Sequence, residues 1–136
     1  MSTPFIVCGA AGRMGRTLVA LLTQTDGAKL VGAVEAAGNP TVGTDAGDLA
    51  GVGNLGVRIT DDFASLSGTD AVTLDFTNAE AALEHLRVAT RARRPIVIGS
   101  TGFTPQQQAE LDALAPQTRC VIASNMSIGI TVLLQI

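Results

Sequence analysis

Three glycines follow an apolar run near the start of the chain and could form a phosphate-binding turn. The run Phe5–Cys8 ends at Gly9, and Gly12 and Gly15 follow before an apolar pattern of helical period begins. Such a turn needs a residue that tolerates positive φ, a close approach of backbone to anion, and a small residue where helix and strand cross. The first N–H groups of the helix then face the anion. The spacing therefore predicts a pyrophosphate site at Gly9–Gly15.

An acidic residue ends the next apolar run. Glu35 closes the strand expected over Lys29–Glu35, about 20 residues after the last glycine of the turn, where a dinucleotide fold places a carboxylate for the adenosine ribose. The Gly-x-x-Gly-x-x-Gly spacing differs from the commoner Gly-x-Gly-x-x-Gly. The prediction therefore depends on strand, glycines, helix and acid occurring together. The alternative is an ordinary glycine-rich turn followed by a solvated glutamate.

The only histidine and the two cysteines are not spaced for catalysis. His85 lies between charged neighbours on an expected helix, so we interpret it as a solvated surface residue. Cys8 and Cys120 lie in or beside apolar runs, where a thiol behaves as a small hydrophobe. The sequence offers neither thiol a nearby histidine or a Cys-x-x-Cys spacing. We therefore predict no catalytic residue and no disulfide framework.

Two loop acids could be metal ligands. Asp45 and Asp48 lie in the glycine-rich stretch 36–56, but no further ligands are spaced to join them. We interpret both as solvated loop residues and predict no metal site.

The composition excludes several functional classes. The chain has 136 residues, 46% of them hydrophobic, and a formal net charge of −3, which provides no field to attract nucleic acid or an anionic membrane. It has no Trp or Tyr and only 4 Phe, so it lacks the stacking surfaces of a single-strand nucleic-acid binder. No apolar run reaches the length of a membrane span. We expect a cytoplasmic protein that binds neither nucleic acid nor membrane.

Strands and helices alternate along the chain. This order predicts an α/β fold: a Rossmann-like, doubly wound parallel sheet with helices on both faces. We expect strands over 5–8, 29–35, 57–60, 71–76, 95–98 and 119–123, helices over 13–24, 78–91 and 105–114, a short helix over 61–67, and one short helical turn within 36–56.

Capping boxes are expected to begin two of the helices. In the first, Thr77 accepts from a first-turn N–H and Glu80 reaches back; in the second, Thr104 and Gln107 have the same roles with Pro105 at the first helical position.

Ligands of open parallel sheets bind at the carboxyl ends of the strands. Besides the glycine turn and the end of the second strand, three loops are expected at that edge: 75–77, 99–103 and 124–127. They contain few titratable groups, so the edge suits the binding of a cofactor better than the transfer of protons.

Five motifs in this order resemble the bacterial 4-hydroxy-tetrahydrodipicolinate reductases of lysine and diaminopimelate biosynthesis. The resemblance runs from about Phe5 to the last residue. The motifs are Gly9-Ala10-Ala11-Gly12-Arg13-Met14-Gly15 with Glu35, Thr44-Asp45-Ala46-Gly47-Asp48, Asp75-Phe76-Thr77, Gly99-Ser100-Thr101-Gly102-Phe103, and Ser124-Asn125-Met126-Ser127-Ile128-Gly129.

The resemblance implies an oxidoreductase in which a nicotinamide cofactor donates hydride to an unsaturated cyclic dicarboxylate. By match, the pyrophosphate would be held by Gly9, Ala10, Ala11, Gly12, Arg13 and Met14, and the adenosine ribose by Glu35. The nicotinamide side would be held by Phe76, Thr77, Gly99, Ser100 and Thr101, and the site would be closed by Ala123, Ser124, Asn125 and Met126.

Two departures from the family pattern have consequences. Members that accept NADPH well often have Arg directly after the ribose-binding acid, and this chain has Ala36. Arg13 could reach a 2′-phosphate, but Glu35 would repel it, so we predict that NADH is preferred over NADPH. The family's His-rich catalytic block and its carboxylate-binding loop would lie beyond Ile136, so no residue here is predicted to be the catalytic acid.

The expected organisation is a dinucleotide-binding domain over 1–127 and, over 128–136, the start of a connecting helix. The chain would thus be truncated before the substrate and tetramerisation domain, and inactive by itself. The intact family is homotetrameric, and the sequence does not fix the oligomeric state of this chain. Two alternatives remain open: the first domain of another two-domain dehydrogenase of the aspartate or homoserine type, and a stand-alone dinucleotide-sensing module.

Overall fold

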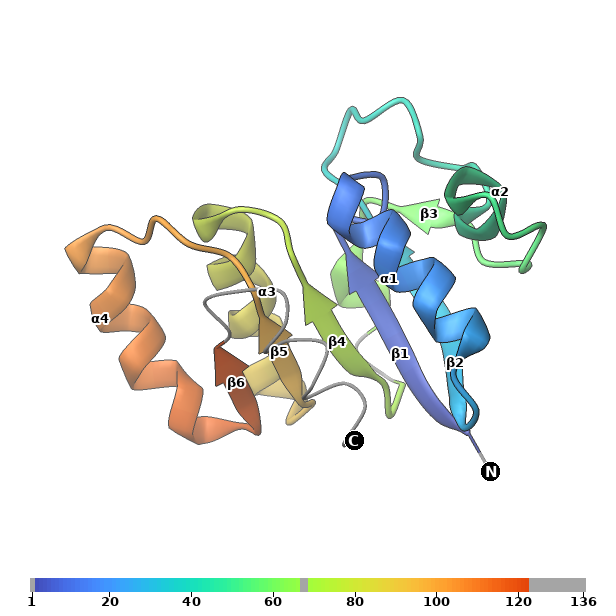
Figure 1. The fold of residues 1–136 in the computed structure, drawn as a ribbon. Helices are drawn as coiled ribbons and strands as arrows, with labels where there is room; N and C mark the ends of the chain where they lie inside the picture. The colour runs from blue at the N-terminus through green and yellow to red at the C-terminus, as the bar shows by residue number, and fades with distance from the viewer. Residues whose placement is uncertain (1, 67–68, 123–136) are drawn as a thin grey trace.

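The computed structural model describes residues 2–66 and 69–122, which form a parallel sheet with helices on both faces (Figure 1). The strands of this part are β1 (Thr3–Cys8), β2 (Ala28–Val34), β3 (Ile59–Thr60), β4 (Val72–Asp75), β5 (Ile96–Ile98) and β6 (Cys120–Ile122). They lie in the order β3-β2-β1-β4-β5-β6, and each neighbouring pair is parallel. The order reverses between β1 and β4, which confirms the predicted doubly wound sheet.

The helices cover opposite faces of the sheet because the strand side chains alternate in direction. The helices are α1 (Arg13–Gln24), α2 (Ala46–Ala50), α3 (Ala79–Ala92) and α4 (Pro105–Leu114), with 3-10 turns η1 (Phe63–Leu66) and η2 (Ala115–Gln117). Leu18, Val19 and Leu22 of α1 pack with Phe5 and Val7 on one face. On the other face, η1 and α3 pack on Ile6 and Cys8, and α3 and α4 pack on β5.

Most predicted bounds agree with the structure to within two residues. Helix α1 begins and ends where the apolar period predicts. The short helix expected over 61–67 is the 3-10 turn η1, and the expected turn within 36–56 is α2. Within the described residues no helix is long and apolar enough to cross a bilayer. Residues 123–136, which include the expected connecting helix, lie outside the described part of the chain.

One of the two predicted capping boxes is wrong. The Thr104 box is present with both reciprocal hydrogen bonds and Pro105 in the first turn. Helix α3, in contrast, is capped by Asn78, whose side chain accepts from the N–H of Ala81 at 2.9 Å. The hydroxyl of Thr77 instead donates to the carboxylate of Asp75 at 2.6 Å. The Thr77 side chain, which was expected to cap the helix, therefore bonds to the buried carboxylate of Asp75 on the preceding strand.

Asp45 organises the segment between β2 and β3 and is not a freely solvated acid. Its carboxylate caps α2 by accepting from the N–H of Asp48 at 3.0 Å. It also accepts from the N–H groups of Leu55 and Val57, each at 2.9 Å. These backbone hydrogen bonds, led by that from Leu55, lower the pKa of Asp45. One carboxylate thus closes the loop 45–57, while Asp48 remains exposed as predicted.

Candidate functional site

A cavity of about 320 Å³ lies at the carboxyl ends of β1, β2 and β4. It occupies the point where the strand order reverses, which is where open α/β sheets bind ligands. The carboxyl ends of these strands lie at the upper edge of the sheet in Figure 1. The lining residues come from four segments of the chain: Gly9, Gly12, Val34, Glu35, Ala36, Ala37, Asp61, Phe76, Thr77, Asn78, Ala81 and His85.

The glycine turn forms one wall and requires its glycines. Gly9 has a φ of +84°, and the N–H of Gly12 closes the turn on the carbonyl of Gly9 at 3.0 Å. A Cβ at Gly15 would lie 2.0 Å from that carbonyl oxygen, so only glycine lets α1 start this close to the turn. No side chain caps α1 at Gly12. The first-turn N–H groups are therefore left for a ligand, as an anion site requires.

Glu35 lies against the turn. Its Oε2 accepts from the N–H of Ala11 at 2.9 Å, and its Oε1 accepts from the N–H of Ala36 at 3.1 Å. Each oxygen of an ionised carboxylate has a second lone pair, so Glu35 can accept further hydrogen bonds from a ligand in the cavity. The arrangement brings the predicted ribose acceptor and the predicted pyrophosphate turn together.

The loops after β4 and β5 meet at an aromatic ring. A Cβ at Gly99 would lie 2.1 Å from the ring of Phe76, so the absence of a side chain lets the ring lie on this backbone. The N–H of Gly99 donates to the carbonyl of Asp75 at 2.8 Å. Ser100 is buried, and its Oγ has no hydrogen-bond partner among the described residues. Thr101 is exposed.

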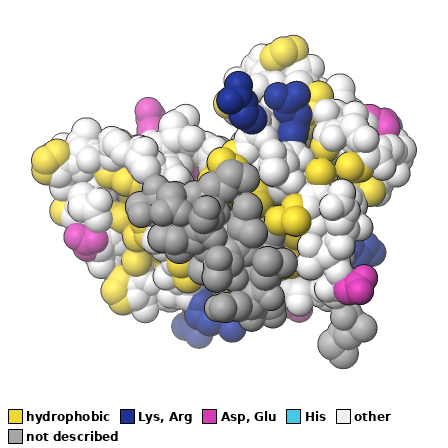
Figure 2. Space-filling model, in the orientation of Figure 1, with side chains coloured by type: hydrophobic (Ala, Val, Ile, Leu, Met, Phe, Trp, Pro, Cys, Tyr) yellow, Lys and Arg dark blue, Asp and Glu magenta, His cyan; other side chains and the backbone are white. Residues whose placement is uncertain are grey.

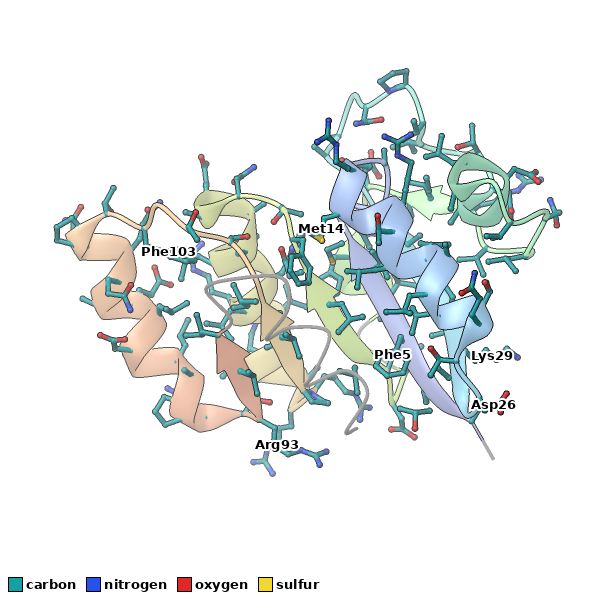
Figure 3. All side chains as sticks on the ribbon, in the orientation of Figure 1. Phe5, Met14, Asp26, Lys29, Arg93 and Phe103 are labelled. Atoms are coloured by element: carbon teal, nitrogen blue, oxygen red, sulfur yellow. The ribbon has the colours of Figure 1, made fainter. Side chains whose placement is uncertain are left out.

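The predicted site residues are thus only partly brought together. Gly9, Gly12, Glu35, Phe76 and Thr77 line the cavity. The others lie around it: Ala10 and Ala11 are in the turn, and Gly99 lies behind Phe76. Met14, at the start of α1, packs like Phe76 against the core of buried residues (Figure 3). The four predicted residues Ala123, Ser124, Asn125 and Met126 lie outside the described residues.

Arg13 faces a different hollow. Together with Arg16, Thr17 and Gln24 of α1, it lines a groove between α1 and α2. Lys or Arg side chains gather over the start of α1 in Figure 2. The groove is distinct from the cavity that Glu35 lines. The cationic side chains of α1 therefore border the glycine turn from outside the cavity.

His85 is not the solvated residue that its sequence neighbours suggest. Its side chain is 13% exposed, and Nδ1 bonds to Oδ2 of Asp75, whose side chain is fully buried. The ring also packs on Phe63 of η1 with centroids 4.7 Å apart. The sequence does contain a pattern that could have placed His85 at the site. Asn78, Ala81 and His85 are spaced three and four residues apart, which puts them on one side of α3.

Cys8 completes a buried cluster with these two residues. Ligand atoms of Cys8, Asp75 and His85 lie within 4.8 Å of one another, a spacing that a metal ion could use. Burial, and then the charges of Asp75 and Glu35, raise the pKa of the Cys8 thiol well above its usual value. A metal-ligating thiol must lose its proton, and His85 Nδ1 is already bonded to Asp75. The cluster therefore fits a hydrogen-bonded network better than a metal centre.

Fold and site together define a dinucleotide-binding domain: a doubly wound sheet with an uncapped glycine turn and an acid at the end of the second strand, at the switch point. The residues fit such a ligand. The turn supplies N–H groups that no side chain caps, Glu35 supplies acceptors, and Ser100, in the loop after β5, has a buried hydroxyl without a partner among the described residues.

The profile of the family described as "Dihydrodipicolinate reductase, N-terminus" matches residues 3–126, so the chain belongs to this family. The 4-hydroxy-tetrahydrodipicolinate reductase of Geotalea daltonii is 47% identical over 127 residues, which cover 93% of this chain and 47% of that protein. That of Anaeromyxobacter dehalogenans strain 2CP-1 is 45% identical over 98% of this chain and 50% of that protein. The chain thus spans about half the length of these relatives.

The fold also matches solved structures. The dipicolinate-bound dihydrodipicolinate reductase from Paenisporosarcina sp. TG-14 superposes with a TM-score of 0.72, at 23% identity, over 98% of this chain and 51% of that one. At this identity the likeness supports the fold alone.

Proposed function

We propose that the chain is the nicotinamide-dinucleotide-binding part of a 4-hydroxy-tetrahydrodipicolinate reductase. In this proposal NADH or NADPH supplies hydride to an unsaturated cyclic dicarboxylate. One observation supports the proposal most. This chain, which belongs to the reductase family, has a cavity lined by Gly9, Gly12 and Glu35 at the point where the strand order of the sheet reverses. The chain's own residues would bind and orient the dinucleotide. The residues of proton transfer would belong to the part of the family pattern that this chain does not span.

We further propose that NADH is preferred. The adenosine 2′ position would lie beside Glu35, and the next residue in the cavity wall is Ala36, which has no charge to pair with a phosphate. The cations Arg13 and Arg16 line the neighbouring groove. A 2′-phosphate would therefore meet the Glu35 carboxylate at closer range than either guanidinium.

We propose that residues 1–127 form the dinucleotide-binding domain, that the whole enzyme is cytoplasmic, and that it works as a homotetramer on a small dicarboxylate. The two cysteines are free, as is usual in a reducing compartment. The aspartate or homoserine dehydrogenase alternative and the stand-alone sensor are not favoured, because the family match and the relatives described above belong to the reductase.

Calorimetric titration of the chain with NADH and NADPH in parallel tests the proposal. We expect saturable binding of both, tighter for NADH, and loss of both in Gly12→Val, because a branched side chain at the turn would occupy the pyrophosphate position. Circular dichroism checks that the variant is folded, since a Cβ at Gly12 would lie 3.3 Å from the carbonyl oxygen of Gly9. Absence of binding by the folded wild-type chain would refute the proposed site. Equal or tighter NADPH binding would refute the preference alone.

A further inference from the structure

Asp75, the buried member of the Asp75–His85 pair, lies directly behind Thr77, a residue of the cavity wall. Asp75 is the last residue of β4 and is fully buried. Its Oδ2 bonds to Nδ1 of His85, while its Oδ1 accepts from the N–H of Thr77 at 3.1 Å and from the hydroxyl of Thr77 at 2.6 Å. Thr77 and His85 both line the cavity. A single carboxylate thus connects α3 to the loop that borders the proposed ligand.

The polarity of this network is fixed by the chemistry of its members. An ionised carboxylate can only accept hydrogen bonds, so the Thr77 hydroxyl must donate its single proton to Asp75. The other contact of that hydroxyl, to the carbonyl of Asn78 at 3.4 Å, is also with an acceptor. The proton of the Thr77 hydroxyl is therefore used within the protein, and toward the cavity this hydroxyl can only accept.

His85 is the part of the network that orients the carboxylate. Its Nδ1 bonds to Oδ2, and toward an ionised carboxylate this nitrogen acts as the donor, which fixes the plane of the carboxylate and keeps Oδ1 directed at Thr77. The imidazole is itself held by its contact with the Phe63 ring, and α3 is held by its Asn78 cap. His85 therefore acts on the cavity through Asp75 and Thr77, as residues behind a metal or catalytic site orient the groups in front.

We propose that Asp75 and His85 are a positioning pair that presents the Thr77 hydroxyl as a hydrogen-bond acceptor for a donor group of the bound dinucleotide. The inference rests on the proposed function. The donor is a hydroxyl of the ribose on the nicotinamide side or the carboxamide NH₂ of the nicotinamide. The family resemblance assigns a cofactor-binding role to neither His85 nor Asp75, although Asp75 begins the Asp75-Phe76-Thr77 motif.

Titration of the chain with NADH, ADP-ribose and AMP tests the pair. We expect about a tenfold loss of NADH affinity, the worth of one hydrogen bond to a well-placed group, in Thr77→Val and in His85→Phe, which keeps a ring against Phe63 but removes the donor. AMP affinity should not change. Thr77→Ser and His85→Asn, which keep the hydroxyl and a donor near the Nδ1 position, should bind NADH within about threefold of the wild type.

The double variant Thr77→Val/His85→Phe identifies the route of action. If His85 acts only through Thr77, the double variant binds NADH no more weakly than Thr77→Val alone, because coupled residues are not additive. Titration with ADP-ribose, which has no nicotinamide, identifies the donor. If the variants lose as much affinity for ADP-ribose as for NADH, the donor is the ribose hydroxyl. If their affinity for ADP-ribose does not change, the donor is the carboxamide. Additive losses, or an AMP affinity that falls together with that of NADH, would overturn the pair as a positioning device. Failure of the wild type to bind NADH would refute the proposed function itself.

A measurement without ligand tests the geometry separately. The chain has one histidine, so its imidazole ¹⁵N resonances need no assignment by mutation. We expect Nδ1 to carry a proton, with a downfield ¹H signal that is retained in Thr77→Val and lost in His85→Phe. A neutral imidazole protonated only at Nε2 would overturn the inference even if the binding data agreed.

Discussion

Glu35 accepts a hydrogen bond of 2.9 Å from the backbone N–H of Ala11, which ties the acid that follows β2 to the glycine turn that follows β1. The acid that is expected to bind ribose thus also holds the turn in place. Neighbouring parallel strands bring the two together, since Cys8 and Val34 are partners in the β1–β2 register. Substitutions at Glu35 therefore act on the turn as well as on the ligand, and an informative variant must separate these effects.

Glu35→Gln makes this separation. Glutamine retains an oxygen for the N–H of Ala11 and removes the charge that would repel a 2′-phosphate. It loses the acceptor for the N–H of Ala36, a change that weakens NADH and NADPH binding alike and cancels in the ratio of the two affinities. We expect the ratio of NADPH to NADH affinity to rise about fivefold, the scale of one screened charge at short range. Asp26→Asn is the matched control, because Asp26 lies at the opposite end of the sheet (Figure 3). An equal rise in the control would assign the effect to net charge.

Ala36→Arg tests the same preference from the opposite direction. Ala36 is exposed and lines the cavity directly after Glu35, so a guanidinium there could pair with a 2′-phosphate. We expect NADPH to bind about tenfold more tightly, with NADH changed less than about twofold. Ala113→Arg, at an exposed position of α4, controls for the added charge. Unchanged NADPH affinity would place the adenosine ribose elsewhere.

Gly15→Ala should destabilise the fold, although Gly→Ala within a helix usually stabilises it. The new Cβ would lie 2.0 Å from the carbonyl oxygen of Gly9, a backbone atom that cannot move aside cheaply. We expect a loss of about 2–4 kcal/mol in the free energy of unfolding, measured by urea denaturation. In Gly12→Ala the same contact is 3.3 Å, and we expect a loss below about 1 kcal/mol. Similar losses in both variants would mean that the close approach of α1 to the turn is not what selects glycine.

Local patterns predict this fold well because each of its units is specified by neighbouring residues. The apolar period gives the bounds of α1, and the Thr104–Gln107 pair with Pro105 gives the start of α4. The positions of the glycines and of Glu35 follow from strand, turn and helix occurring in sequence. Because parallel strands end at one edge, these local units also predict which loops meet.

Two of the predictions that the structure contradicts, the helix cap at Thr77 and the exposure of His85, depend on contacts between different elements. Thr77 and Asn78 can both cap a helix, and the choice falls on Asn78 because Asp75 takes the Thr77 hydroxyl. His85 has charged neighbours in sequence, yet α3 packs its ring over the end of β4, ten positions back along the chain. Neither the burial of Asp75 nor its partners can be derived from residue spacing alone, since both depend on how α3 lies on the sheet.

Asp45→Asn should weaken the fold in a pH-dependent manner. The Asp45 carboxylate accepts from three backbone N–H groups, those of Asp48, Leu55 and Val57. An asparagine offers one oxygen and turns an NH₂ toward the remaining donors. We expect a lower melting temperature at pH 7 and faster proteolysis within 45–57. Asp48→Asn, which changes an exposed acid three residues away, should be nearly neutral.

The direction of the pH effect follows from the lowered pKa of Asp45. A carboxyl whose pKa is lower in the folded state stabilises the fold above its unfolded pKa of about 3.9 and loses this contribution as pH falls through the folded pKa. The difference in melting temperature between wild type and Asp45→Asn should therefore be constant from pH 7 to about 5 and narrow below about pH 4. A difference that persists undiminished at pH 3 would mean that the shape of the side chain, and not its charge, closes the loop.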